Sequence, residues 1–151
     1  MKKLIYHFVN DDELLRITNK IRECEKRTAG EICVSIKEHK TFLQRRTPVA
    51  ELAKREFVRL GIGKTRDKTG ILIYILLGER QFFILADTAI NKMVTENTWH
   101  KIKDGMQEFF IKGMFAKGII YGVEETGKVL TEHFPVKPDD KNEISDSVII
   151  K

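Results

Sequence analysis

Apolar residues recur every three or four positions in four stretches of the chain, which is the spacing of one face of a helix. In the first stretch, residues 11–29, Asn10 or Asp11 can cap a helix and Gly30 can end it. The other three stretches show the same periodicity. We therefore predict helices over residues 11–29, 48–60, 95–112 and 115–133.

The second and fourth of these helices carry further local signals. Thr47 and Pro48 open the second helix with a cap residue followed by a proline in the first turn. Gly61 ends it at a position where a left-handed residue is favoured. The fourth helix contains Gly118, Gly122 and Gly127. Because glycine disfavours a helix interior, we expect close backbone packing to compensate.

Three other stretches have the pattern of β-strands. Residues 31–37 alternate between two sets of side chains, with isoleucine or valine at every second position. Residues 71–77 are continuously apolar and rich in β-branched side chains, which predicts a central strand covered on both faces. Residues 81–86 follow a short turn and are expected to form its hairpin partner.

Turn and crossover geometry predict the topology. We expect Leu77 and Arg80 to close a two-residue hairpin, and this register places Gly70 opposite Asp87. A strand–helix–strand connection within one sheet is a right-handed crossover that joins parallel strands. The order α-β-α-β-β-α-α therefore predicts an α/β fold: a mixed β-sheet, with a parallel crossover and an antiparallel hairpin, sandwiched between helices.

This topology places three acidic residues at one end of the sheet. Parallel strands start at the same end, so Glu31 is expected beside Gly70 and Asp87. Asp67 lies in the loop that leads into Gly70. This end of the sheet is the candidate site.

Length and composition indicate one domain. A chain of 151 residues with 42% apolar content can form a single core. We assign residues 1–134 to this domain and predict that the polar residues 135–151 form a disordered tail. Its apolar residues 148–150 are candidates for docking on a sheet edge or a partner. Cys24 and Cys33 match neither a metal cluster nor a disulfide framework, and we interpret them as buried thiols.

The location and charge of the chain restrict its partners. The N-terminus is not a convincing export signal, and the longest apolar run is too short for a transmembrane helix, so we predict a cytoplasmic protein. The net charge of +5 is concentrated in residues 37–66. Such a segment can attract nucleic acid, anionic lipid or phosphorylated ligands. Since no aromatic residues are interleaved in a nucleic-acid-binding pattern, we favour a solvated helix face.

Several spaced motifs resemble the TPM domain family, which includes thylakoid-lumen phosphatase-like and bacterial proteins. They are TAGEI at residues 28–32, LGIG at 60–63, TGIL at 69–72, and Arg80 followed by FILAD at 83–87. The resemblance covers about residues 10–134. It implies a mixed sheet between helices, divalent-metal binding, calcium especially, and the acid phosphatase activity attributed to some members. The strand after Arg80 departs from the family, because it ends in Ala-Asp instead of a Gly-Tyr-Gly type sequence.

The candidate metal ligands are Asp67, Asp87 and Glu31. Calcium, and magnesium as the alternative, prefer hard oxygen ligands, which carboxylates and loop carbonyls supply. Each acid also has a structural interpretation. Asp67 can form a turn, Asp87 can cap a segment that starts at Thr88, and Glu31 can pair with a basic residue of the loop.

Phosphate ester hydrolysis is the alternative chemistry for the same end. Lys64, Arg66 and Lys68 could hold a phosphate, while Asp67 or Asp87 holds the ion or attacks. The common phosphatase signatures are absent from the sequence. We therefore predict a metal-binding domain with weak or no phosphatase activity. A metal-dependent acid phosphatase acting on phosphomonoesters and a non-catalytic protein-interaction module are the two alternatives.

Overall fold

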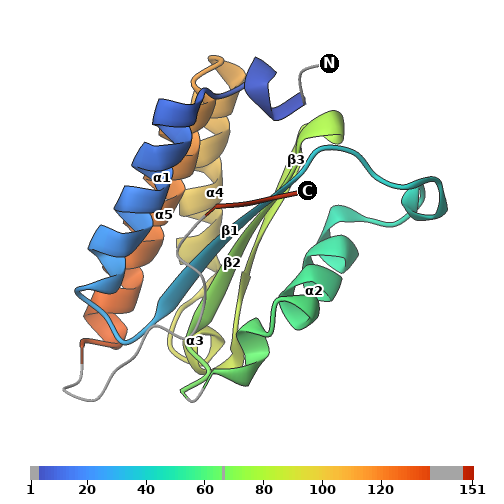
Figure 1. Cartoon of the computed structure of the whole chain (residues 1–151). Helices are drawn as coiled ribbons and strands as arrows, with labels where there is room; N and C mark the ends of the chain where they lie inside the picture. The colour runs from blue at the N-terminus through green and yellow to red at the C-terminus, as the bar shows by residue number, and fades with distance from the viewer. Residues whose placement is uncertain (1–3, 66, 137–147) are drawn as a thin grey trace.

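A four-stranded mixed sheet forms the middle layer of the protein, in the order β3-β2-β1-β4 (Figure 1). The structure is a computed structural model, and it describes residues 4–65, 67–136 and 148–151. The strands are β1 (Glu31–Lys37), β2 (Gly70–Leu76), β3 (Gln81–Ala86) and β4 (Ile149–Ile150). The helices are α1 (Asp11–Glu25), α2 (Val49–Arg59), α3 (Thr88–Asn91), α4 (Glu96–Ile111) and α5 (Phe115–His133). Helices α1, α4 and α5 cover one face of the sheet and α2 covers the other (Figure 1).

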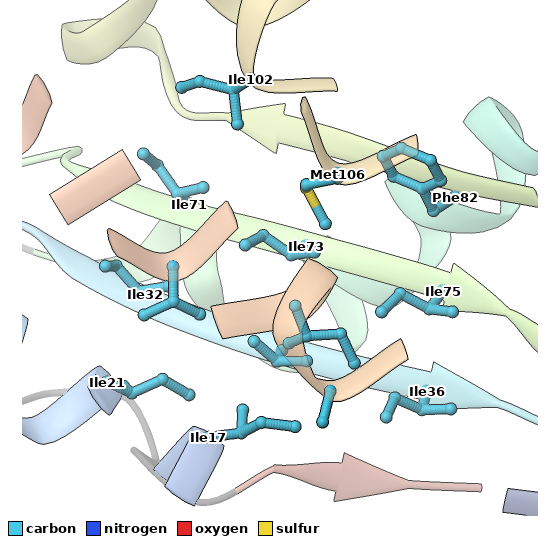
Figure 2. Close-up of a cluster of buried hydrophobic side chains, with 14 of the residues drawn as sticks. Ile17, Ile21, Ile32, Ile36, Ile71, Ile73, Ile75, Phe82, Ile102 and Met106 are labelled. Carbon is cyan, nitrogen blue, oxygen red and sulfur yellow. The ribbon is translucent and has the colours of Figure 1, made fainter. Parts of the chain in front are cut away.

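The strand pairings confirm the predicted mixed sheet. β1 runs parallel to β2, and β2 runs antiparallel to β3. Every residue of β2 is buried, as expected for a central strand covered on both faces. Alternate side chains of a strand point to opposite faces. Figure 2 shows Ile71, Ile73 and Ile75 of β2 in the core on the side of the three helices, near Ile102 and Met106 of α4.

The hairpin register is confirmed, and the Arg80 amide donates to the Leu77 carbonyl at 3.1 Å across Gly78 and Glu79, but the turn is not a simple two-residue one. Ile71 pairs with Ala86, and the Asp87 amide donates to the Gly70 carbonyl at 2.9 Å, as the predicted register requires. The connection, however, consists of the 3₁₀ turn Leu77–Glu79 followed by Arg80 in the left-handed region. Leu77 is buried in the same cluster as Ile73 and Ile75, although it belongs to the turn and not to the strand ladder.

Two helix boundaries differ from the prediction. α1 ends at Glu25 because the next residues contact the end of α5: the Thr28 hydroxyl donates to the Leu130 carbonyl at 3.0 Å. α2 begins at Val49, since Pro48 has an extended backbone and occupies the cap position predicted for Thr47. α4 and α5 lie within one residue of, or at, their predicted bounds.

The glycines of α5 confirm the expected close packing. A Cβ atom at Gly118 would lie 2.5 Å from the Phe110 ring, and one at Gly122 would lie 2.5 Å from the Met106 sulfur. At Gly127 it would lie 2.7 Å from the Cys24 sulfur. Larger residues at these positions would separate α5 from α4 and α1.

The last described residues extend the sheet. Ile149 and Ile150 pair in parallel with β1, which confirms the docking on a sheet edge considered for residues 148–150. The Lys151 amide donates to the Ile36 carbonyl at 2.8 Å. Residues 137–147, most of the predicted disordered tail, lie outside the described residues, so the proposed domain boundary stays a prediction.

Cys24 and Cys33 are both free and buried, as interpreted from the sequence, and burial raises the pKa of Cys33 to about 12. Within the described residues, no helix is both long enough and apolar enough to cross a bilayer. The cytoplasmic location stays a prediction.

Candidate metal site at the loop end of the sheet

Two of the predicted acids lie on either side of Gly70, at the start of β2. Glu31 pairs with Gly70 on one side, and Asp87 is hydrogen-bonded to Gly70 on the other. Residues in register on neighbouring strands face the same side, and Leu72 of β2 shows that this is the α2 side. Since Gly70 has no side chain, nothing from β2 stands between the two carboxylates. Their predicted placement at one end of the sheet is confirmed.

The backbone spacing explains why these acids do not form a ready-made chelate. Glu31 and Asp87 are separated by two strand spacings, which is about 9–10 Å. Among the residues that the structure describes, no group of three or more His, Cys, Asp or Glu side chains could hold a metal ion. The structure therefore does not bring Glu31, Asp67 and Asp87 together as a three-carboxylate cluster. Their assignment as ligands stays a prediction.

Asp87 is buried, with 8% of its surface exposed. Its Oδ1 accepts a hydrogen bond from the Thr88 amide at 2.7 Å, which confirms the interpretation of Asp87 as the cap of the following helix. Its Oδ2 is also buried and accepts no hydrogen bond from any described residue. A buried carboxylate oxygen without a partner is costly, and such an atom calls for a physical explanation.

The loop between α2 and β2 packs against the same end. Gly61 begins it in the left-handed conformation, as predicted, with φ of 72°. The Lys68 carbonyl accepts a hydrogen bond from the Ala89 amide at 3.3 Å, which joins the loop to α3. The hydroxyl of Thr65 is buried and has no hydrogen-bond partner among the described residues. This end thus contains a second buried oxygen without a partner.

The residues predicted to bind phosphate are placed differently from one another. Lys64 is exposed. The Lys68 ammonium donates to the Gly63 carbonyl of its own loop. Arg66 lies outside the described residues, and Asp67 is half-buried. Their role in holding a phosphate stays a prediction.

Glu56 is a buried acid that the sequence interpretation missed. It lies on α2, and its Oε2 accepts a 2.6 Å hydrogen bond from the Ser35 hydroxyl of β1. Its Oε1 accepts from Arg59 Nε at 2.8 Å and from Lys151 Nζ at 3.0 Å. Because three donors already occupy this carboxylate, it fastens α2 and the chain end to β1. The sequence does contain a signal for its burial: Glu56 follows Leu52 by four positions, which places it on the apolar face of the predicted helix.

Glu56 also affects a neighbouring phenol. Burial raises the pKa of Tyr74 to about 12, and the negative charge of Glu56 adds to this rise. Tyr74 belongs to the same buried cluster as Leu52 and Cys33. The α2 face of the sheet therefore buries ionisable groups, among them the Glu56 carboxylate and the Tyr74 phenol.

A mixed sheet with three helices on one face, one on the other and two strand-end acids defines a class of small α/β domain. The chain belongs to the TPM domain family, because the family model matches residues 6–129. This membership confirms the resemblance drawn from the motifs. The fold class is confirmed by the sheet and helices described above. No match was found among the curated proteins.

Three solved structures show the same fold. The NMR structure of the BA42 protein from the psychrophilic bacterium Bizionia argentinensis has a TM-score of 0.85 and 30% identity, over 95% of this chain and 96% of that one. The N-terminal domain of a protein from P. gingivalis has a TM-score of 0.69 and 18% identity, over 86% of this chain and 83% of that one. The N-terminal domain of the cg2496 protein from Corynebacterium glutamicum has a TM-score of 0.54 and 12% identity, over 81% and 74%. The last two likenesses concern the fold alone.

Proposed function

We propose that this TPM domain binds a divalent cation, calcium in particular, at the loop end of its sheet, with weak or no phosphatase activity. The observation that carries the proposal is the buried Oδ2 atom of Asp87, which accepts no hydrogen bond from the described residues. A cation beside this oxygen would offset the cost of its burial. Family membership supports the same chemistry.

Asp87 would be the principal ligand, and other oxygens at this end would complete the shell. The Thr65 hydroxyl supplies a second buried oxygen. Glu31 and Asp67 are the further carboxylates, as the sequence predicts. Calcium accepts six to eight oxygens in flexible geometry, whereas magnesium demands a compact octahedron. Because Glu31 and Asp87 are two strand spacings apart, the larger and more adaptable ion fits this arrangement better.

The absence of a preformed three-acid group among the described residues predicts modest affinity. We expect a dissociation constant on the order of 10⁻⁴ M, the range of calcium sites with few fixed charged ligands. Bound calcium would supply charge stabilisation at the sheet end. Asp87 would hold the ion through one oxygen while its other oxygen continues to cap α3.

The same geometry argues for weak catalysis. Nucleophilic attack would require a free, activated carboxylate or an activated water. Oδ1 of Asp87 is already engaged at 2.7 Å by the Thr88 amide, which suits a holding role better than attack. Lys64 is exposed and Lys68 donates to its own loop, so neither is fixed toward Asp87 by a described contact.

Calorimetric titration with calcium tests the proposal. Wild type should bind calcium more tightly than magnesium, and Asp87→Asn should weaken calcium binding by at least about tenfold. Asp104→Asn removes the same charge from an exposed position of α4 and should bind like wild type. If wild type gives no heat of binding, or if Asp87→Asn binds calcium equally well, the proposed cation site at Asp87 is wrong. Either result would favour the alternative of a non-catalytic interaction module.

Hydrolysis of para-nitrophenyl phosphate by the same proteins separates metal binding from catalysis. We expect at most slow turnover that is the same in wild type and Asp87→Asn. Equal rates in the two proteins would be attributed to a contaminating enzyme. A calcium-dependent rate that falls about a hundredfold in Asp87→Asn, but not in Asp104→Asn, would establish the metal-dependent phosphatase instead.

A further inference from the structure

A cavity of about 600 Å³ opens at the opposite end of the sheet from Asp87. It lies where the N-terminal 3₁₀ turn (Leu4–His7), the β2–β3 hairpin, the end of α4 and the start of α5 meet. Its volume is within the range of small-molecule sites. The lining residues are His7, Phe8, Ile75, Leu76, Leu77, Arg80, Gln81, Phe82, Gln107, Phe110, Ile111, Gly113 and Phe115.

One wall of this cavity is a continuous row of four phenylalanine rings. The ring centroids of Phe8 and Phe115 are 5.2 Å apart, and those of Phe115 and Phe110 are 5.3 Å apart. Phe110 meets Phe82 edge-on at 5.2 Å. Gly118 leaves room for this row, because a Cβ atom there would lie 2.5 Å from the Phe110 ring. The wall is preformed, and it suits an apolar chain or ring.

The polar groups of the cavity are basic or neutral. Arg80, His7, Gln81 and Gln107 are its polar lining residues, and none of the lining residues is acidic. The Arg80 side chain is exposed and forms no ion pair with a described residue. Glu79, next to Arg80 in the chain, instead pairs with Lys40 at 3.0 Å. The cavity therefore combines an apolar wall with an uncompensated positive charge.

The backbone at Arg80 is a second, independent observation. Its φ of 53° lies in the left-handed region, where glycine or asparagine is less strained than arginine. Strained residues of this kind cluster at ligand-binding positions. Arg80 thus occupies a left-handed position where glycine or asparagine would be less strained.

We propose that this cavity binds a small amphipathic carboxylate, a free acid with an apolar chain or ring. The apolar part would lie on the phenylalanine row, and the carboxylate would bind the Arg80 guanidinium, whose two parallel N–H groups match it. Gln81 and Gln107 would supply further donors. The site is independent of the proposed cation site, because the two lie at opposite ends of β2.

Titration with sodium decanoate below its micellar concentration tests the proposal on the whole chain. Wild type should bind one decanoate, and Arg80→Asn should weaken binding by at least about tenfold. Asparagine tolerates the left-handed backbone, so this variant keeps the turn. Arg80→Lys keeps the charge but cannot donate two parallel N–H bonds, so its affinity should fall between those of wild type and Arg80→Asn. Arg45→Asn removes an exposed arginine that contacts Phe42 outside the cavity and should bind like wild type.

Two comparisons decide among the outcomes. Decan-1-ol and decyltrimethylammonium carry the same chain without the anion and should bind at least about tenfold more weakly than decanoate. Amide NMR shifts on adding decanoate should appear at Phe82, Gln107 and Gly113 and not at Asp87. Equal binding of all three probes, unchanged affinity in Arg80→Asn, or no saturable binding would each overturn the proposal.

Discussion

The two faces of the sheet differ in the kind of groups they bury. The face covered by α1, α4 and α5 holds the larger apolar cluster, which includes Ile73 of β2 and Ile119 of α5. The α2 face holds a smaller cluster together with the three buried acids of the described residues, Glu31, Glu56 and Asp87. The first face stabilises the fold by apolar burial. The second buries carboxylates: Glu56 is held by three donors, whereas Oδ2 of Asp87 accepts no hydrogen bond from a described residue, and we expect chemistry there.

The contrast predicts the largest loss of stability on the face of the three helices. Ile119 is fully buried between α5 and the sheet, so Ile119→Ala should lower the free energy of unfolding by about 3–4 kcal/mol. Val58 on the outer side of α2 is 74% exposed, and Val58→Ala should cost less than about 0.5 kcal/mol. Urea unfolding measures both. Equal losses would mean that the packing assigned to α5 is wrong.

Breaking the buried ion network of the α2 face should have the next largest effect. Glu56→Ala leaves the Ser35 hydroxyl and Lys151 without their acceptor and should cost about 2–3 kcal/mol. Glu51→Ala breaks only an exposed pair with Arg55 at 3.6 Å and should cost less than about 0.5 kcal/mol. The same urea experiment compares them. A small effect at Glu56 would show that its carboxylate is hydrated and not a fastening point.

High pH should weaken the α2 face by a smaller amount. Burial and then Glu56 raise the folded pKa of Tyr74 to about 12 from an ordinary value of 10.0, so the folded protein retains a proton that the unfolded chain loses. Stability is therefore complete below pH 10 and falls as the pH rises toward 12, by at most about 1.4 kcal/mol per pH unit. Tyr74→Phe removes this group while keeping the ring.

Between pH 10 and 11 the free energy of unfolding of Tyr74→Phe should fall by about 1 kcal/mol less than that of wild type. Cys33, whose pKa burial also raises to about 12, titrates in both proteins, so their difference isolates Tyr74. Parallel pH profiles of the two proteins, measured by thermal unfolding, would contradict the assigned burial of the phenol.

Much of the fold could be predicted from the sequence because its signals are local. Periodic apolar residues specify α4 and α5, and the continuous apolar run specifies β2. The turn after β2 differs from the prediction, since its left-handed residue is Arg80, a residue type that gives no local signal for this conformation. Likewise α1 ends early because Thr28 bonds to Leu130, which is distant in the chain.

The candidate site was predictable in place but not in detail. Strand register follows from topology, so Glu31 and Asp87 could be assigned to one end of the sheet. Register does not say whether side chains converge, and the described residues contain no three-acid group. The cavity near Arg80 was not predicted at all, because its aromatic wall is assembled from Phe8, Phe82 and α4–α5 residues far apart in sequence.

Thermal unfolding with and without calcium tests the cation site most directly. In wild type, calcium at ten times its dissociation constant should raise Tm by about 3–6 °C. In Asp87→Asn the same calcium should raise Tm by less than about 2 °C, while the Tm in chelator stays within about 2 °C of wild type because asparagine can also cap α3. An equal rise in both proteins, or no rise in wild type, would contradict the proposed site at Asp87.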